Sequence, residues 1–157
     1  MKILVGLDHS DTSSEALRWV RRVEWPAGSS VIVTTAVAPS LLPVSDGFAP
    51  EPEVASAIYD QQVKAARTLV ARAVKTLRDV GLPAEARIVN GDAREELIEL
   101  ARRERSDLIV VGSHGRTGLT KLVLGSVSSH VVTHAPCTVV VVKQGFGTET
   151  VPARRKS

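Results

Sequence analysis

The chain has 157 residues, of which 43% are hydrophobic and 24% charged, and its formal net charge is +3. This composition is typical of one globular domain and excludes a disordered or collagen-like chain, and no stretch approaches the ~20 apolar residues of a membrane helix. Most lysines and arginines alternate with acids, aromatic residues make up 3% of the chain, and the single Cys137 cannot form an internal disulfide. We therefore expect a cytoplasmic protein that binds neither nucleic acid nor membranes.

Aliphatic runs without polar alternation predict the strands of the fold. The four strongest runs lie at residues 2–7, 31–37, 108–111 and 139–142, and a weaker one lies at residues 84–89. Such runs are typical of strands that are buried on both faces of a parallel sheet.

Helical patterns fill the intervals between these runs. Their apolar stripes consist of Ala16, Leu17, Val20 and Val23, then Ile58, Ala66, Leu69, Ala73, Leu77 and Val80, then Leu97, Ile98 and Ala101. Thr12 and Asp92 each stand three residues before a glutamate, which predicts a capping box at the start of two helices. A fourth helix is expected to follow Gly125 and to end before Pro136.

The alternation of strands and helices predicts the architecture. Units of this length imply right-handed crossovers, so we expect an α/β fold with a doubly wound, five-stranded parallel sheet and helices on both faces. A proline-rich loop that begins at Pro39 and ends at Pro52 interrupts the pattern, and residues 144–157 form a polar tail. One domain is therefore expected over residues 1–143.

The most distinctive segment follows the fourth strand, where Gly112, Gly115 and Gly118 lie within seven positions and Gly125 opens the next helix. Glycine permits positive φ and close backbone approach, and the free N–H groups of a helix N-terminus attract anions. The segment thus has the composition of a phosphate cradle. Tight strand-to-helix turns also need glycine, so a purely structural role is the alternative.

The spacing Gly112-x2-Gly115-x9-Gly125-Ser126 resembles the nucleotide-binding signature of the universal stress protein family, in its ATP-binding branch. The resemblance covers nearly the whole chain, including residues 3–8 and 135–142. It implies an adenine nucleotide alpha hydrolase-like fold with strand order 3-2-1-4-5 and a regulatory, ATP-binding role in the stress response. The ends of strands one and four would then meet where the strand order reverses, which is where open α/β sheets bind ligands.

The resemblance also implies a set of ligand-contacting residues. On the adenine and ribose side these are Gly6, Leu7, Asp8 and Ala36; on the ribose and phosphate side they are Val111, Gly112, His114, Gly115, Arg116, Gly125, Ser126, Val127 and Ser128. The expected ligand is ATP, ADP or AMP, with Mg²⁺ on the phosphates, and Asp8 would accept from a ribose hydroxyl or help to hold the metal. Asp8 and Ser126 each have a structural alternative, as a turn residue and as a helix cap, and Arg116 could equally face solvent.

Other chemistry is less well supported by the sequence. It contains no G-x4-G-K-[ST] run and no G-x-G-x-x-G run, which disfavours a P-loop phosphotransferase and a Rossmann dinucleotide site. We expect binding without dedicated catalytic residues. The alternatives are a slow ATPase or nucleotidyl-chemistry enzyme on the same site, and a dimerisation module that binds no nucleotide.

His130 and His134 stand four residues apart with Cys137 close behind, a pattern that raises the question of a zinc site. No fourth ligand is evident, so packing and capping roles are expected for the histidines, and burial in a strand is expected for the cysteine.

The final strand begins at Thr138 and ends at Lys143, and in the order 3-2-1-4-5 it lies at an edge of the sheet. Its four consecutive valines leave an apolar edge without internal charge or proline, which invites pairing with another strand. We expect a homodimer formed by two-fold pairing of this strand, as occurs in the family that the chain resembles. The alternative is that the tail from Gln144 folds back over the edge.

Overall fold

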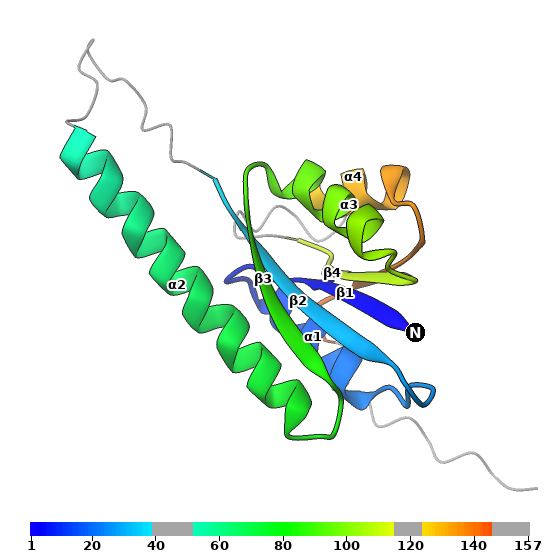
Figure 1. Cartoon of the computed structure of the whole chain (residues 1–157). Helices are drawn as coiled ribbons and strands as arrows, with labels where there is room; N and C mark the ends of the chain where they lie inside the picture. The colour runs from blue at the N-terminus through cyan, green and yellow to red at the C-terminus, as the bar shows by residue number, and fades with distance from the viewer. Residues whose placement is uncertain (39–51, 115–123, 146–157) are drawn as a thin grey trace, which may run out of the picture.

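Five parallel strands form the centre of the protein (Figure 1). They are β1 (Lys2–Gly6), β2 (Ser30–Val37), β3 (Ala84–Asn90), β4 (Leu108–Gly112) and β5 (Thr138–Val142). Their order in the sheet is β3-β2-β1-β4-β5, which confirms the predicted topology. The computed structural model describes residues 1–38, 52–114 and 124–145.

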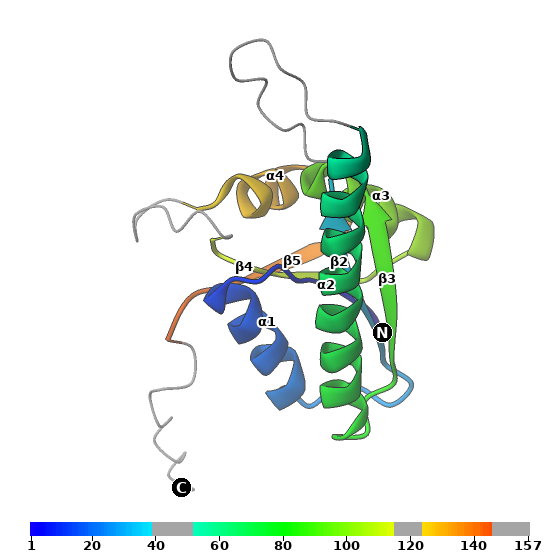
Figure 2. The ribbon, with the colours of Figure 1, turned by 90° about the vertical axis from the view of Figure 1, so that its left-hand side faces the viewer.

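Two helices pack against each face of the sheet, as predicted (Figure 2). The helices α1 (Asp11–Arg22) and α2 (Pro52–Arg78) cover one face, and α3 (Ala93–Glu104) and α4 (Ser126–His134) cover the other. Successive strand residues point to opposite faces, so Ile3 and Val5 join the core under α1 and α2 while Leu4 joins the core under α3 and α4. This is why β1 and β4 are continuous aliphatic runs. Within the described ranges, no helix combines the length and the apolar character that crossing a membrane requires.

The start of α1 differs from the predicted capping box. Ser10, not Thr12, is the N-cap, and its side chain accepts from the backbone N of Ser13. The Asp8 carboxylate accepts from the Ser10 backbone N at 3.0 Å and holds Ser10 in this position. Thr12 is instead buried in the first turn, where its hydroxyl donates to the carbonyl of His114.

The end of α2 also differs from the prediction, which placed Val80 on the apolar stripe of the helix. The helix ends at Arg78, and Val80 is 53% exposed. Gly81 has φ +79° and its N–H bonds to the carbonyl of Arg78 at 2.9 Å. A left-handed glycine of this kind ends a helix, so Val80 lies beyond the last turn that packs on the sheet.

Asp92 is the N-cap of α3, as predicted, and accepts from the backbone N of Arg94 at 2.8 Å. The Arg94 guanidinium and then the Arg94 backbone N–H lower the pKa of Asp92 to about 2. Because this folded-state pKa lies below the ordinary 3.8, the stabilisation is present above about pH 4 and is lost as the pH falls towards 2.

Asp92→Ala is therefore expected to lower the melting temperature at pH 7 by about 2–4 °C, the effect of losing a typical N-cap of about 1 kcal/mol. The difference between wild type and variant should shrink between pH 4 and pH 2, because the wild-type carboxylate becomes protonated there. Thermal unfolding of both proteins across this range tests the expectation, and a difference independent of pH would contradict it.

Candidate functional site

A cavity of about 250 Å³ opens at the carboxyl ends of β1, β2 and β4. β1 lies between β2 and β4 in the sheet, so the cavity is at the point where the strand order reverses. It brings together the predicted ligand-contacting residues that the structure describes: Gly6, Leu7, Asp8, Ala36, Val111, Gly112, His114, Gly125, Ser126, Val127 and Ser128. Gly115 and Arg116 lie outside the described residues.

The lining also includes residues that sequence reasoning missed as site residues: Ser13, Thr34, Thr35, Val89, Ala93 and Leu97. Two signals in the sequence were available. Thr34 and Thr35 interrupt an aliphatic strand, and Ala93 and Leu97 are four residues apart on one helix face. What the sequence did not show is that this helix face reaches the end of the sheet.

One half of the cavity is apolar, with walls from β3 and α3. Its floor is closely packed at Gly6: a Cβ built there would lie 3.1 Å from Leu97 Cδ2 and 3.2 Å from Val111 Cγ1. Val89, Ala93 and Leu97 line the same half. The absence of a side chain at Gly6 therefore lets Leu97 and Val111 pack closely over this position, and a side chain here would push them into the cavity that they line.

The other half of the cavity is formed by the N-terminus of α4. Gly125 is its N-cap and provides no side-chain cap, and the first backbone bond of the helix runs from Ser129 N to Gly125 O at 2.9 Å. The N–H groups of Ser126, Val127 and Ser128 precede that bond and have no acceptor within the helix. An uncapped helix N-terminus attracts anions through these groups and the helix dipole.

The cap interpretation of Ser126 is wrong, because Gly125 occupies the cap position. Ser128 braces the loop: its buried hydroxyl lies 3.0 Å from Ser113 O and 2.9 Å from Gly125 O, both of which accept. The Ser128 hydroxyl is therefore engaged within the protein, whereas the backbone N–H groups at the start of α4 have no acceptor within the helix.

Gly112 has a packing role in addition to its place in the cavity. A Cβ at this position would lie 2.6 Å from the backbone C of Thr12 and 2.8 Å from the N of Ser13. Among the described glycines, those with positive φ are Gly28, Gly81, Gly91 and Gly145. Of the two general reasons for glycine in this segment, Gly112 is therefore required by close approach, here of α1 to β4, and not by a left-handed backbone.

Polar contacts join the N-terminus of α1 to the end of β4. The Thr12 hydroxyl donates to His114 O, and His114 N donates to Thr12 Oγ1 at 3.4 Å. The His114 Nδ1 lies 3.0 Å from Ser113 Oγ, whereas its Nε2 is buried without a partner. Asp8 is the one formally charged side chain among the described lining residues. Any anion held here would therefore rely on backbone N–H groups for most of the contacts that these residues provide.

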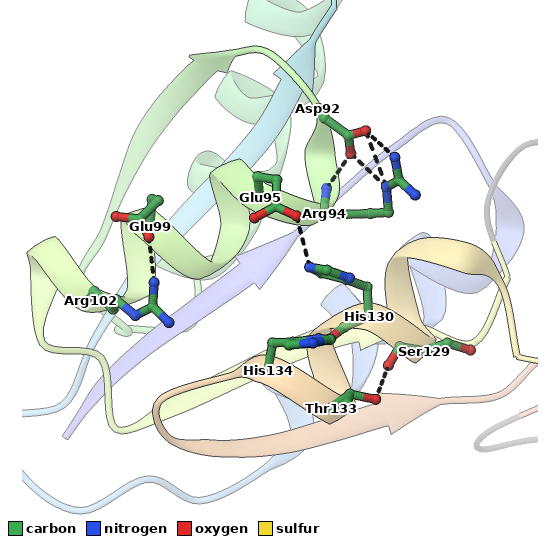
Figure 3. Close-up of polar contacts among 9 residues, drawn as sticks. All are labelled: Asp92, Arg94, Glu95, Glu99, Arg102, Ser129, His130, Thr133 and His134. Atoms are coloured by element: carbon green, nitrogen blue, oxygen red, sulfur yellow. Dashed lines mark hydrogen bonds and ion pairs between the residues drawn. The ribbon is translucent and has the colours of Figure 1, made fainter.

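Of the two histidines of α4, His130 connects this helix to α3 (Figure 3). His130 Nε2 lies 3.1 Å from Glu95 Oε1 on α3, and the ring stacks on His134 with centroids 4.2 Å apart. No group of three or more potential metal ligands occurs in the part of the chain that the structure describes. Cys137 is only partly buried, against the core under α3 and α4, and this burial raises the pKa of its thiol.

Comparisons with known proteins agree with this architecture. The model of the universal stress protein family matches residues 1–143. Universal stress protein MJ0531 of Methanocaldococcus jannaschii is 30% identical over 146 residues, covering 91% of this chain and 82% of the relative. Universal stress protein YxiE of Bacillus subtilis is 30% identical over 151 residues, covering 90% and 98%.

Solved structures show the same fold. The structure of the MJ0577 protein of Methanocaldococcus jannaschii superposes with a TM-score of 0.80 at 30% identity, covering 91% of this chain and 95% of that one. UspA from Lactobacillus plantarum has a TM-score of 0.76 at 23% identity, covering 90% and 97%. The residues that the family model matches include all the described strands and helices. The chain therefore belongs to the universal stress protein family.

Proposed function

We propose that the cavity binds an adenine nucleotide, with the base in the apolar half and the phosphates at the N-terminus of α4. The observation that carries this proposal is the juxtaposition of apolar walls from Val89, Ala93 and Leu97 with the uncapped amides that follow Gly125, within one cavity. A base needs apolar walls and a phosphate needs converging N–H groups, and the cavity supplies both.

The known ligands of proteins with this fold support the choice of adenine. Structures of the same fold have been solved in complex with cAMP, with AMP and with dAMP. These chains are 24%, 21% and 22% identical to this one, so they support the fold's capacity for adenine nucleotides and leave the individual contacts to this chain's own residues.

Within this proposal the predicted residues have distinct roles. Leu7 and Ala36 lie on the side of the base and ribose, and the N–H groups of Ser126 and Val127 hold the phosphates. His114 lies between the two sides, with its buried Nε2 available to a ligand oxygen. Gly115 and Arg116 remain predicted contacts outside the described residues.

Asp8 is the group that would hold Mg²⁺ together with the phosphates. It is the one carboxylate among the described lining residues, and both hydrogen bonds to its side chain, from Ser10 N and Ser10 Oγ, go to the same oxygen, Oδ1. Magnesium bound to a nucleotide commonly takes one or two protein carboxylates, which fits this donor set. The proposed role is regulatory binding in the stress response, with turnover of ATP slow or absent.

Saturating MgATP is expected to raise the melting temperature by roughly 5–10 °C. A ligand that binds only the native state stabilises it by about 2.7 kcal/mol at a hundred times its Kd, and about 2–4 °C accompany each kcal/mol in a domain of this size. Differential scanning fluorimetry with MgATP, ADP and AMP measures the shift, with CTP as the control for the base. An unchanged melting curve up to millimolar adenine nucleotide would refute the proposal. In a separate activity assay, hydrolysis of ATP at roughly 1–100 per second would instead support the alternative that the protein is an enzyme.

We further propose that the protein forms a homodimer through β5. The carbonyl of Val142 accepts from Ser113 N at 2.8 Å and so faces β4. Because the N–H and C=O groups of successive strand residues point to opposite sides, those of Val139 and Val141 face the open edge. A hollow lined by Trp19 and the residues from Val140 to Gly145 lies beside this edge.

Val141→Pro is expected to convert the dimer into a monomer, because proline removes one outward N–H and leaves the bonds to β4 in place. Light scattering should give about twice 16.8 kDa for wild type and 16.8 kDa for the variant. Val141→Thr keeps the N–H and is the matched control, which should stay dimeric. A wild-type mass of one chain would show that β5 forms no such interface.

A further inference from the structure

Thr34 is a polar side chain in the middle of the aliphatic strand β2, and its hydroxyl has no partner. The residue is 0% exposed, and its Oγ1 makes no hydrogen bond. The Thr34 carbonyl is engaged, since it accepts from Leu7 N at 2.8 Å. A buried hydroxyl without a partner is destabilising, so we expect a bound ligand to supply the hydrogen-bond partner that the unliganded protein lacks.

The Thr34 side chain lies on the face of the sheet that carries the apolar half of the cavity. Ile32 and Ala36, two positions away on either side, both belong to the core under α3 and α4, and alternation places Thr34 on that same face. In the sheet register Thr34 stands directly beside Gly6, and it lines the cavity. Gly6 on β1 and the unpartnered hydroxyl of Thr34 on β2 are therefore neighbours in the sheet.

Two described lining residues carry a buried polar side-chain atom without a partner: Thr34 and His114. His114 follows β4, on the side of the cavity assigned to the phosphates. The rest of the apolar half comes from Val89, Ala93 and Leu97, whose side chains offer no hydrogen bond. Thr34 thus provides the unpartnered hydroxyl that can hydrogen-bond to a polar atom of a group that enters the apolar half of the cavity.

We propose that the Thr34 hydroxyl hydrogen-bonds to the polar edge of the bound base and makes Thr34 a determinant of base specificity. This inference rests on the proposed nucleotide function. A base enclosed by apolar walls loses water from its ring nitrogens and exocyclic groups, and a hydroxyl can donate to the former or accept from the latter. A site that pairs one such atom rejects a base whose edge leaves the hydroxyl unpaired.

The test compares wild type with Thr34→Val and Thr34→Ser by isothermal titration calorimetry. Valine has nearly the same shape and lacks the hydroxyl, so the Kd for MgATP is expected to rise about tenfold, whereas serine keeps the hydroxyl and should stay within about twofold of wild type. Inorganic triphosphate, which has no base, should bind all three proteins equally. The unliganded Thr34→Val protein should melt no lower than wild type, because the hydroxyl it loses is unpartnered.

Purine riboside triphosphate, which lacks the 6-amino group, identifies the atom that Thr34 contacts. Equal binding of this analogue to wild type and Thr34→Val assigns the contact to the amino group, and a persistent tenfold difference assigns it to a ring nitrogen.

If Thr34→Val binds MgATP as wild type does, or loses triphosphate binding to the same extent, the role of Thr34 is overturned while the nucleotide function stands. If wild type binds no adenine nucleotide, the proposed function and this inference fail together.

Discussion

Replacing Gly112 with alanine is expected to lower the melting temperature by roughly 6–12 °C. The added Cβ would lie 2.6 Å from the backbone C of Thr12 and 2.6 Å from its Oγ1, so the first turn of α1 must move away from β4. Overpacking against backbone costs about 3 kcal/mol, at the upper end of the usual range, and each kcal/mol accounts for about 2–4 °C in a domain of this size.

The displacement should also weaken nucleotide binding, because the contacts between Thr12 and His114 cross the same junction. Thermal unfolding of the unliganded protein measures the effect on stability, and Gly6→Ala is the matched control. Its Cβ meets only the side-chain tips of Leu97 and Val111, at 3.1 and 3.2 Å, so a smaller loss of stability is expected. Equal melting temperatures for wild type and Gly112→Ala would mean that α1 does not need this close approach.

Gly6→Val is expected to weaken the binding of MgATP by more than about a hundredfold while the protein stays folded. The valine Cβ would already lie 3.1 Å from Leu97 Cδ2 and 3.2 Å from Val111 Cγ1, so its methyl groups would push these lining side chains into the apolar half, where we place the base. Filling that space removes the favourable burial of the ring and forces it against α3, and about 2.7 kcal/mol corresponds to a hundredfold loss.

Calorimetry with MgATP and a melting curve of the unliganded variant together separate occlusion from misfolding. The series of wild type, Gly6→Ala and Gly6→Val should show a graded loss of affinity, with a fall in melting temperature of about 2–4 °C for the valine variant, the effect of about 1 kcal/mol. Wild-type affinity in Gly6→Val would place the base elsewhere in the protein.

Gly112 and Gly6 line the same cavity, but glycine is needed at the two positions for different physical reasons. Gly112 is needed because a helix backbone approaches it, whereas the atoms that approach Gly6 are the side-chain ends of Leu97 and Val111, which line the cavity. The family resemblance assigned both to ligand contact. A variant at Gly112 therefore reports on folding first, and a variant at Gly6 reports on the ligand.

The elements and the topology were largely predictable from local sequence. Strands buried on both faces must be apolar at successive positions, so β1 and β4 appear as unbroken aliphatic runs, and β2 as a run interrupted by Thr34 and Thr35. Asp92 was predicted as a cap from the glutamate three residues later, and the prediction of the cap holds because its carboxylate needs only an N–H two residues along the chain. The end of α2 was missed, since the apolar Val80 continued the stripe while Gly81 had already ended the helix.

The cavity could be predicted only in part, because its residues come from segments far apart in the chain. The signature after β4 pointed to Gly125 and the amides beyond it, but the role of Thr12 depends on a carbonyl 102 positions away. Whether the Thr34 hydroxyl finds a partner depends on the register that sets it beside Gly6 and on where α3 packs. Local propensity specifies which residues form a strand or a helix, whereas these contacts arise only when the sheet and its two helical layers are packed together.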